Sequence, residues 1–538
     1  MADRDSIPLL WRNSLADTAD RPFLRIPTNE QARTLSYNVS AFFKRAARVA
    51  VALRKLLKLA AGSRVAVFSH DLNEFALGIH GVLLAEMTAC IAEPANDELL
   101  ASLFRRQGVK AVVFPPSSSA RIARLIPKLP EVKHWIVSGK GASSSSLGVV
   151  ERLETLLTAA SGEEDAVFNW GEKSKGPAVI FQENMWSEDV LSLSSSQLIG
   201  TAKRFCDSFD GIVSDELGGL FWSAFSPGEF HGAFQSLFSP FFSRLPVVIR
   251  ELDDSRDFWR QVLADGVQIA AIHDELLYSL VARGKTRDWV RSDKLRVVVY
   301  SKARACIDLF REFEKKFLVP VSLVYSRPEL GGPITFAGPR KGDRPGWESK
   351  KEVPSHGDII DSVSVYIKDS QGEVLAPEEI GNVFVQGDQF PSCERLARSK
   401  SNVPENSVNL SQLGFVDLGS GGAERLFILG DAERILRKGE RTIFLEKIEQ
   451  ALLQMKGVVL CRAHVFPNAH TGKELGVYVI PHRLANLNRF DVEMFLAENL
   501  AEGEIPRVCV LGEPSSGTLP EDDQISLAFE EYYSYDYR

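Results

Sequence analysis

The sequence predicts an α/β fold built on doubly wound, mostly parallel sheet. Between residues 64 and 325, short apolar strands alternate with amphipathic helices, an order that is typical of parallel strands joined by helices. From residue 357 the pattern changes, because Val363, Val365 and Ile367 alternate with polar residues as in half-exposed antiparallel strands. After residue 430 a shorter mixture of helices and strands predicts a small α+β unit.

The predicted elements can be placed one by one. A helix covers residues 35–60, because apolar side chains recur there at helical spacing with basic residues on the other side. Next come a strand (64–68), an apolar helix (73–85), a short strand (89–91), a helix (97–106) and a strand (110–114). Later strands are expected at 178–181, 219–222, 246–250, 268–272, 295–300 and 320–325, and later helices at 193–209, 255–264 and 306–317.

Composition and charge argue against several kinds of protein. The chain has 538 residues, 44% of them hydrophobic and 25% charged, which is typical of a globular protein of more than one domain. The net charge of −8 disfavours a nucleic-acid partner or an anionic membrane surface. No run of about 18 apolar residues exists, so no membrane span is expected, and no secretion signal is evident. The six cysteines form no CxxC pair, which predicts a reducing, cytoplasmic location and no metal site.

One segment, Gly414–Glu449, has a distinctive order of elements. An apolar strand at 426–429 is expected to be broken by Gly430, and a second strand, a turn at Lys438-Gly439 and a helix from Leu445 follow. This order resembles the hinge of the adenylate-forming superfamily, which includes acyl-CoA synthetases, fatty acyl-AMP ligases and nonribosomal peptide adenylation domains. The opening half is also similar to that family in its helix-and-strand order.

The resemblance implies a domain division and a hinge. It implies a large N-terminal AMP-binding-like domain at 1–429, with a small β-barrel at about 355–429, and a C-terminal lid domain at 430–538. In the family the hinge carries Gly-Arg followed by an Asp or Lys pivot; here the corresponding residues are Gly430, Asp431 and Glu433. The resemblance implies ATP with Mg²⁺ and CoA as cofactors only if the chain is an active ligase.

The family's phosphate-binding loop is rich in glycine, because glycine leaves room for phosphate and accepts unusual backbone angles. The segment that aligns with it here, residues 181–190, contains no glycine. Its residues include Gln182, Glu183, Trp186 and Asp189, and Asp189 stands at the family's lysine position. Carboxylates beside a triphosphate repel it, at roughly a few kcal/mol for each close like-charge pair at an effective dielectric of 20. We expect either a solvated loop or a degenerate phosphate loop.

The family's lid lysine also has no counterpart. In the family this lysine follows a turn and reaches the reacting carboxylate; here the corresponding stretch is Pro514–Glu521, and no lysine occurs from Val508 to Arg538. Loss of a cation that stabilises a transition state typically lowers a rate by about 10²–10³. No catalytic residue is therefore assigned from the sequence.

A remnant of the nucleotide site is expected at Tyr325 and Glu329, where the family has an adenine-stacking Tyr and a Glu that assists Mg²⁺. The alternative is a strand end followed by a capping turn. Ser420 stands where the family has a ribose-binding Asp, and a hydroxyl binds ribose more weakly than a carboxylate does. Asp417 is a possible substitute.

Three basic residues and one histidine complete the candidate set. Arg437, Lys438 and Arg441 fall where relatives hold a surface used in thioester formation, although they can equally be ordinary surface charges. His231 lies near the family's acyl-pocket segment, with the spacing off by one. The acidic, aromatic tail at 530–537 is expected to be a frayed end or a docking peptide.

Three functional hypotheses follow. The first is a noncatalytic homologue, or pseudoenzyme, that acts by binding or scaffolding, with an acyl-activating enzyme or a carrier protein as its partner. The second is a divergent active ligase that makes acyl-adenylates or acyl thioesters. The third is a module that binds an acyl or CoA ligand without chemistry.

Overall fold

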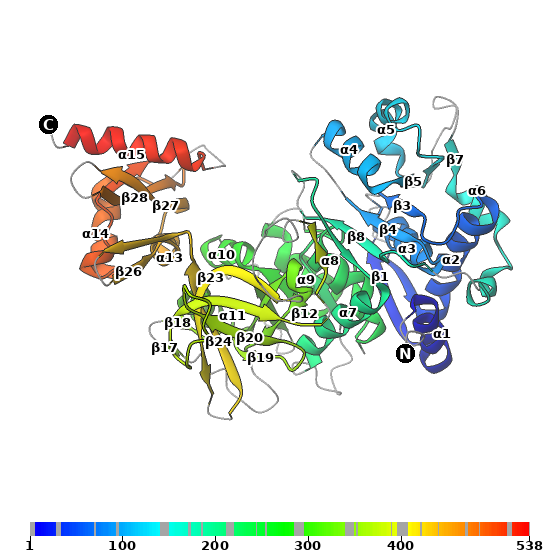
Figure 1. Cartoon of the computed structure of the whole chain (residues 1–538), viewed down its shortest axis with the longest axis horizontal. Helices are drawn as coiled ribbons and strands as arrows, with labels where there is room; N and C mark the ends of the chain where they lie inside the picture. Colours follow the sequence, from blue (N-terminus) through cyan, green and yellow to red (C-terminus); the bar gives the residue numbers. More distant parts are fainter. Residues whose placement is uncertain are drawn as a thin grey trace.

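The structure is a computed structural model that describes residues 6–27, 34–68, 71–92, 96–139, 150–170, 174–183, 187–210, 220–243, 245–252, 255–283, 295–338, 349–350, 353–388, 390–394, 407–419, 422–438, 441–468, 472–483, 485–513 and 519–536. Two large sheets and a six-stranded sheet precede a small C-terminal domain (Figure 1). The first elements of the chain (blue) and the C-terminal elements (orange and red) lie at opposite ends of the molecule in Figure 1.

The first sheet confirms the predicted alternation of strands and helices. Its order is β22 (Ser392–Cys393), β9 (Val190–Leu193), β8 (Val179–Gln182), β4 (Thr88–Ile91), β3 (Arg64–Val67), β5 (Val109–Phe114), β6 (His134–Val137) and β7 (Val150–Arg152). The strands from β8 to β7 are parallel, whereas β9 and β22 are antiparallel to their neighbours. Parallel strands need helical crossovers, which the intervening helices provide.

The second sheet positions most of the candidate site. Its order is β15 (Gly332–Pro333), β14 (Val321–Arg327), β13 (Arg296–Ser301), β12 (Val267–His273), β10 (Leu220–Ser223), β11 (Val247–Val248), β1 (Pro22–Pro27) and β2 (Thr34–Asn38). The strands from β14 to β1 are parallel, so their carboxyl ends lie at one edge. Ligands of open α/β sheets bind at this kind of edge.

Helices cover the faces of both sheets. They are α1 (Ile7–Thr18), α2 (Val39–Val51), α3 (Leu72–Leu84), α4 (Asp97–Gln107), α5 (Ser119–Leu125), α6 (Leu153–Ala159), α7 (Ser195–Asp210), α8 (Phe230–Ala233), α9 (Phe258–Asp265), α10 (Asp274–Arg283) and α11 (Ile307–Phe317). In the part of the chain that the structure describes, no helix is both long and apolar enough to span a bilayer.

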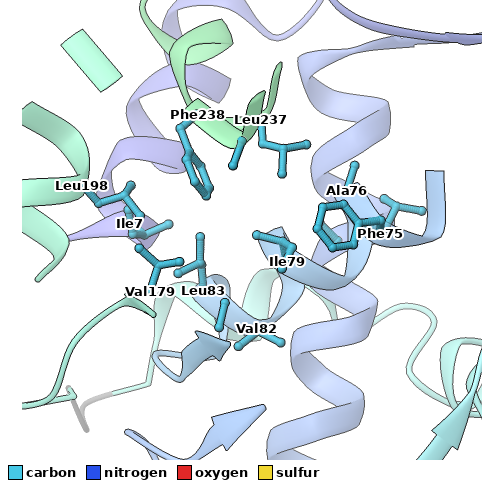
Figure 2. Close-up of a cluster of buried hydrophobic side chains, with 14 of the residues drawn as sticks. Ile7, Phe75, Ala76, Ile79, Val82, Leu83, Val179, Leu198, Leu237 and Phe238 are labelled. Carbon is cyan, nitrogen blue, oxygen red and sulfur yellow. The ribbon is translucent and has the colours of Figure 1, made fainter. Parts of the chain in front are cut away.

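The largest core joins helices α1, α2, α3 and α7 to both sheets. Helix α3 is buried on nearly every side, and Gly81 allows it to approach α2 closely, because a Cβ there would lie 2.4 Å from the Cβ of Val49. Figure 2 shows Phe75, Ile79 and Leu83 of α3 facing Leu237 and Phe238, which belong to the π-helix η6 (Phe234–Phe238). This packing fixes the helix that carries His231 and its neighbours.

The predicted small β-barrel is an antiparallel sheet. Its order is β16 (Thr335–Phe336), β19 (Asp358–Ile359), β24 (Glu424–Asp431), β23 (Ser407–Leu418), β21 (Gly381–Gln386) and β20 (Ser364–Lys368). Within the described residues no pairing between the edge strands β16 and β20 closes it. The predicted strand break at Gly430 was wrong, since β24 continues to Asp431. The predicted domain boundary at 429–430 therefore falls inside this strand.

The C-terminal residues form a small α+β domain, as predicted. It contains the hairpin β25 (Ile435–Lys438) and β26 (Arg441–Phe444), helices α13 (Leu445–Gln454) and α14 (Arg489–Asn499), and the sheet of β27 (Val458–Asn468), β28 (Gly472–Pro481) and β29 (Val508–Leu511). The tail is not frayed, because helix α15 (Asp522–Asp536) buries Ile525 and Phe529 against Phe466.

Candidate active site

The predicted adenine-stacking residue, Tyr325, lies in β14 and is fully buried. Its hydroxyl donates a hydrogen bond to Gln412, and its ring meets the ring of His356 edge-on with centroids 5.6 Å apart. Burial raises the pKa of this phenol. Since no ring face is exposed, stacking on adenine requires the side chain or its strand to move, and the adenine site remains a prediction.

The second predicted nucleotide residue, Glu329, is buried in the 3₁₀ turn Pro328–Leu330 that follows β14. Its carboxylate forms an ion pair with Arg327, with an N–O distance of 2.6 Å. Arg327 also donates to the backbone oxygen of Leu410 at 2.9 Å. The carboxylate thus has a counter-ion within the protein. Its role in holding Mg²⁺ remains a prediction, and that role requires the carboxylate to separate from Arg327. Among the described residues, no group of three or more His, Cys, Asp or Glu is placed to hold a metal ion.

The hinge residues lie where β24 leads into the C-terminal domain. Asp431 accepts a hydrogen bond from the Gln412 amide at 2.9 Å, and its backbone N–H donates to Glu446 at 3.3 Å. A Cβ at Gly430 would lie 2.7 Å from a carboxylate oxygen of Glu446, so glycine permits this close approach. Glu433 is exposed. The structure therefore brings Gly430 and Asp431 together with the first turn of α13, whereas Glu433 stands apart from these contacts.

The segment aligned with the phosphate loop connects β8 and β9 as a hairpin. The side-chain amide of Gln182 donates to the backbone oxygen of Ser187 at 2.8 Å, and the Glu183 backbone N–H donates to the Asp189 backbone oxygen at 2.8 Å. Three residues at the tip, including Trp186, lie outside the described residues, as do Ser420 and residues 514–518 of the lid turn. The predicted roles of these segments remain predictions.

The three basic residues of the proposed thioester surface share one hairpin. Arg437 and Arg441 are exposed, and Lys438 and Arg441 are paired across β25 and β26. Lys438 forms an ion pair with the buried Glu474 of β28. Within the described residues, Lys438 is thus held in an ion pair, whereas no ion pair engages Arg437 or Arg441.

The structure also gathers charged residues that the sequence reasoning missed. Lys302 follows β13, is exposed, and forms no ion pair within the described ranges. Its positive charge favours the ionised forms of Glu229, Asp274 and Glu275. Each of these residues lies at the carboxyl edge of the second sheet, either just after a strand or at the start of a helix. Ligands of such sheets bind at this edge, so a charged residue just after a predicted strand could have been recognised as a site candidate from the sequence.

Two carboxylates of this cluster have opposite pKa shifts. Burial raises the pKa of Asp274 to about 7, although a hydrogen bond from Ser301 opposes the shift. The pKa of Glu275 falls to about 2, chiefly because its carboxylate is hydrogen-bonded to His273 at 2.8 Å. Neighbouring carboxylates with pKa values driven apart are a common feature of functional sites.

His231 lies at the same edge. Its Nε2 is 2.8 Å from the Ser326 hydroxyl, and burial lowers its pKa to about 3, so the imidazole is neutral. Phe225 stacks against it with centroids 5.3 Å apart, and Tyr300 lies 5.9 Å away. A neutral imidazole framed by aromatic rings suits an uncharged organic group.

A cavity of about 90 Å³ lies beside this edge, between the ends of the first-sheet strands and the loop at 226–228. Its floor is apolar, with Phe68, Phe75 and Ile122, and its polar groups include Arg121 and Glu251. This cavity could not be predicted from the sequence, because its lining comes from segments far apart along the chain.

Solved structures with the same fold include a CoA ligase, an ATP-bound protein and a coenzyme A synthetase. The anthranilate CoA ligase AuaEII, in complex with anthranoyl-AMP, is 14% identical with a TM-score of 0.76, covering 99% of this chain and 98% of that one. ATP-bound MatB from Rhodopseudomonas palustris is 19% identical with a TM-score of 0.76, covering 99% of both chains. The O-succinylbenzoate coenzyme A synthetase MenE from Bacillus subtilis is 14% identical with a TM-score of 0.69, covering 94% of this chain and 98% of that one.

Sequence comparison reaches less far. No protein-family profile matches the chain. An uncharacterized acyl–CoA ligase of Bacillus subtilis strain 168, YhfT, is 28% identical over 190 residues, which are 35% of this chain and 36% of that protein. The chain thus matches little more than a third of that relative's length. In its fold, the chain is similar over nearly its whole length to these solved CoA ligase and coenzyme A synthetase structures.

Proposed function

We propose that the protein is a divergent acyl-activating ligase, in which a carboxylate attacks the α-phosphorus of ATP and pyrophosphate leaves. The observation that carries this proposal is Lys302, an exposed cation at the carboxyl edge of the second sheet that forms no ion pair with any residue the structure describes. An anionic transition state is stabilised most by a cation already placed in the site. Lys302 can therefore supply charge that the lid turn at 514–521 lacks.

Three residues of this chain are candidates for holding the nucleotide. Tyr325 and Asp417 are the candidates for the nucleoside, and Lys302 is the candidate for the charged centre. In support, the fold relatives cover nearly the whole chain, including the C-terminal domain. The proposal requires Tyr325 to become accessible, because it is buried in this conformation. The cytoplasmic location belongs to the same proposal.

A second candidate is a noncatalytic homologue that binds an acyl-activating enzyme or a carrier protein. Its support is the sequence itself: residues 508–538 contain no lysine, and the phosphate-loop segment carries Glu183, Glu188 and Asp189. These carboxylates oppose triphosphate binding. A third candidate, a module that binds an acyl or CoA ligand without chemistry, predicts that acyl-CoAs or free acids raise the melting temperature.

Calorimetric titration with Mg-ATP separates the first candidate from the second. The ligase proposal predicts saturable heat at up to millimolar ATP, and a weaker response after Lys302→Met. Absence of heat from the wild-type protein in this range would overturn the ligase proposal and favour the noncatalytic one.

A further inference from the structure

Helix α14 of the C-terminal domain carries apolar side chains on two of its sides. Val492 and Leu496 are buried and belong to the core of that domain. On another side, Phe490 and Met494 are one turn apart and are 67% and 45% exposed. Ala497, the next residue along this line, is exposed as well. We call Phe490, Met494 and Ala497 the outer stripe of α14.

The outer stripe is placed where another molecule can reach it. A helix that only packs onto its own core needs one apolar side, so a second one is available for a partner. Single exposed apolar residues are ordinary on a protein surface, whereas these three follow one line along a helix. In Figure 1, α14 lies at the end of the molecule remote from the first sheet, and the stripe is therefore separate from the candidate active site.

The negative charge of the chain is concentrated in the part that carries the outer stripe. Residues 489–538 contain twelve acidic residues, three arginines and no lysine, a net charge of −9, against −8 for the whole chain. The single basic residue of α14, Arg489, pairs with Glu493 and lies 4.5 Å over the ring of Tyr532. Glu498, one turn after Met494, is exposed and forms no ion pair within the described ranges.

This charge decides between the possible occupants of the stripe. A second copy of the chain that placed its own stripe there would bring Glu498 against like charges. An anionic membrane surface is repelled for the same reason. A protein segment with lysine or arginine beside its apolar residues meets both the stripe and the carboxylates.

We propose that the outer stripe of α14 is a docking surface for another protein that presents a basic amphipathic helix. The apolar residues of this helix cover Phe490 and Met494, and its basic residues face Glu498. Large apolar anchors supply most of the affinity of a small interface, and the charges select the partner. The inference goes beyond the proposed ligase function and does not depend on it.

Three synthetic peptides of about 15 residues, long enough to form a helix, test the proposal by fluorescence anisotropy on the full-length protein. The first has leucine and lysine at amphipathic helical spacing; its twins carry glutamate for lysine, or serine for leucine. Wild-type protein is expected to bind the leucine–lysine peptide at least about tenfold more tightly than either twin. The double variant Phe490→Ser with Met494→Ser should lower that affinity about tenfold. Glu498→Lys should weaken binding of the leucine–lysine peptide and strengthen binding of the leucine–glutamate twin.

The matched control is Val374→Ser, which removes another apolar side chain, 61% exposed, between β20 and β21. It should bind all three peptides as wild type does. All four substituted residues are exposed, so the melting temperature should stay close to that of wild type and a loss of affinity reports the surface itself.

Four results would overturn the proposal. The first two are no binding of the leucine–lysine peptide by wild-type protein, and an equal loss of affinity in Val374→Ser and the double variant. The third is equal binding of the serine–lysine twin, because attraction would then be by charge alone. The fourth is wild-type protein that sediments with phosphatidylcholine vesicles or forms a dimer, where the double variant does neither, because the stripe would then belong to a lipid surface or to a second copy.

Discussion

The phenol of Tyr325 and the carboxylate of Asp431, which belong to two separate predicted motifs, are linked by a single side chain. Gln412 accepts the Tyr325 hydroxyl proton and donates to Asp431 at 2.9 Å. The same amide donates to the backbone oxygen of Lys302 at 3.0 Å. The predicted adenine site, the hinge and the charged edge therefore share one hydrogen-bond centre, and a movement at one of them changes the bonds at the others.

Replacing Gln412 with leucine tests this link. The buried hydroxyl of Tyr325 would lose its acceptor, and we expect a loss of about 1–3 kcal/mol in the free energy of unfolding. Urea unfolding measures the loss, and limited proteolysis of the 431–434 segment reports a loosened hinge. Gln371→Leu, in an exposed turn, should stay within about 0.5 kcal/mol of wild type. Indistinguishable behaviour of the two variants would contradict the link.

Arg434 holds the hinge against the C-terminal domain. Its guanidinium forms ion pairs with Glu449 at 2.6 Å and Glu446 at 3.5 Å, and it donates to the Ala463 backbone oxygen at 3.2 Å. We expect Arg434→Met to cost about 2 kcal/mol, because the buried carboxylate of Glu446 and the largely buried carboxylate of Glu449 lose their cation.

The matched control for Arg434 is Arg311→Met. Arg311 pairs with Asp308 on an exposed helix surface, where an ion pair is worth about 0–1 kcal/mol. Urea unfolding of both variants gives the comparison. If Arg311→Met destabilises the protein as much as Arg434→Met does, the hinge contact has no special role.

The raised pKa of Asp274, about 7, predicts a pH dependence of stability. Between about pH 4, where the unfolded carboxyl ionises, and pH 7, the folded state binds the proton more tightly. Stability from this group therefore falls as pH rises through this window. Asp274→Asn removes the effect, so its melting temperature should exceed that of wild type by more at about pH 8 than at about pH 4.

The nearby charges act in both directions on Asp274. Glu275 raises its pKa further, whereas His273 and Lys302 lower it. Asp308→Asn, which replaces an exposed carboxyl on α11, serves as the control. The difference between its melting temperature and that of wild type should not change with pH. If the melting-temperature difference between Asp274→Asn and wild type is also the same at pH 4 and pH 8, the Asp274 carboxyl does not hold a proton in the folded state near neutral pH.

Lys302 should matter for the reaction more than for the fold. We expect Lys302→Met to lower acid-dependent pyrophosphate exchange by about 10²–10³. The melting temperature should not change, because the side chain is exposed and has no ion-pair partner in the described part of the chain. Lys315→Met, an exposed lysine of α11, should leave the exchange rate unchanged. Equal rates for the two variants would remove Lys302 from the site.

Local patterns predicted the fold well wherever neighbouring residues decide the structure. The apolar runs at 64–68 and 110–114 are β3 and β5, and the helix expected from Leu445 is α13. The tail was misread, because α15 depends on Phe529 reaching Phe466, which is distant in the sequence. The strand break at Gly430 failed for a similar reason, since β24 continues there by pairing with β23.

The candidate site was less predictable than the fold. Tyr325, Glu329 and Asp431 could be proposed from the sequence because they lie in short segments that resemble a family, and their roles remain predictions. Lys302 and Asp274 were missed, because their proximity depends on β12 and β13 being neighbours in the sheet.

The account depends most directly on whether this protein activates a carboxylic acid. Acid-dependent exchange of labelled pyrophosphate into ATP measures that step in the purified full-length chain. We predict exchange above the acid-free background with at least one carboxylic acid. Background-level exchange with every acid tested at millimolar concentration would contradict the account.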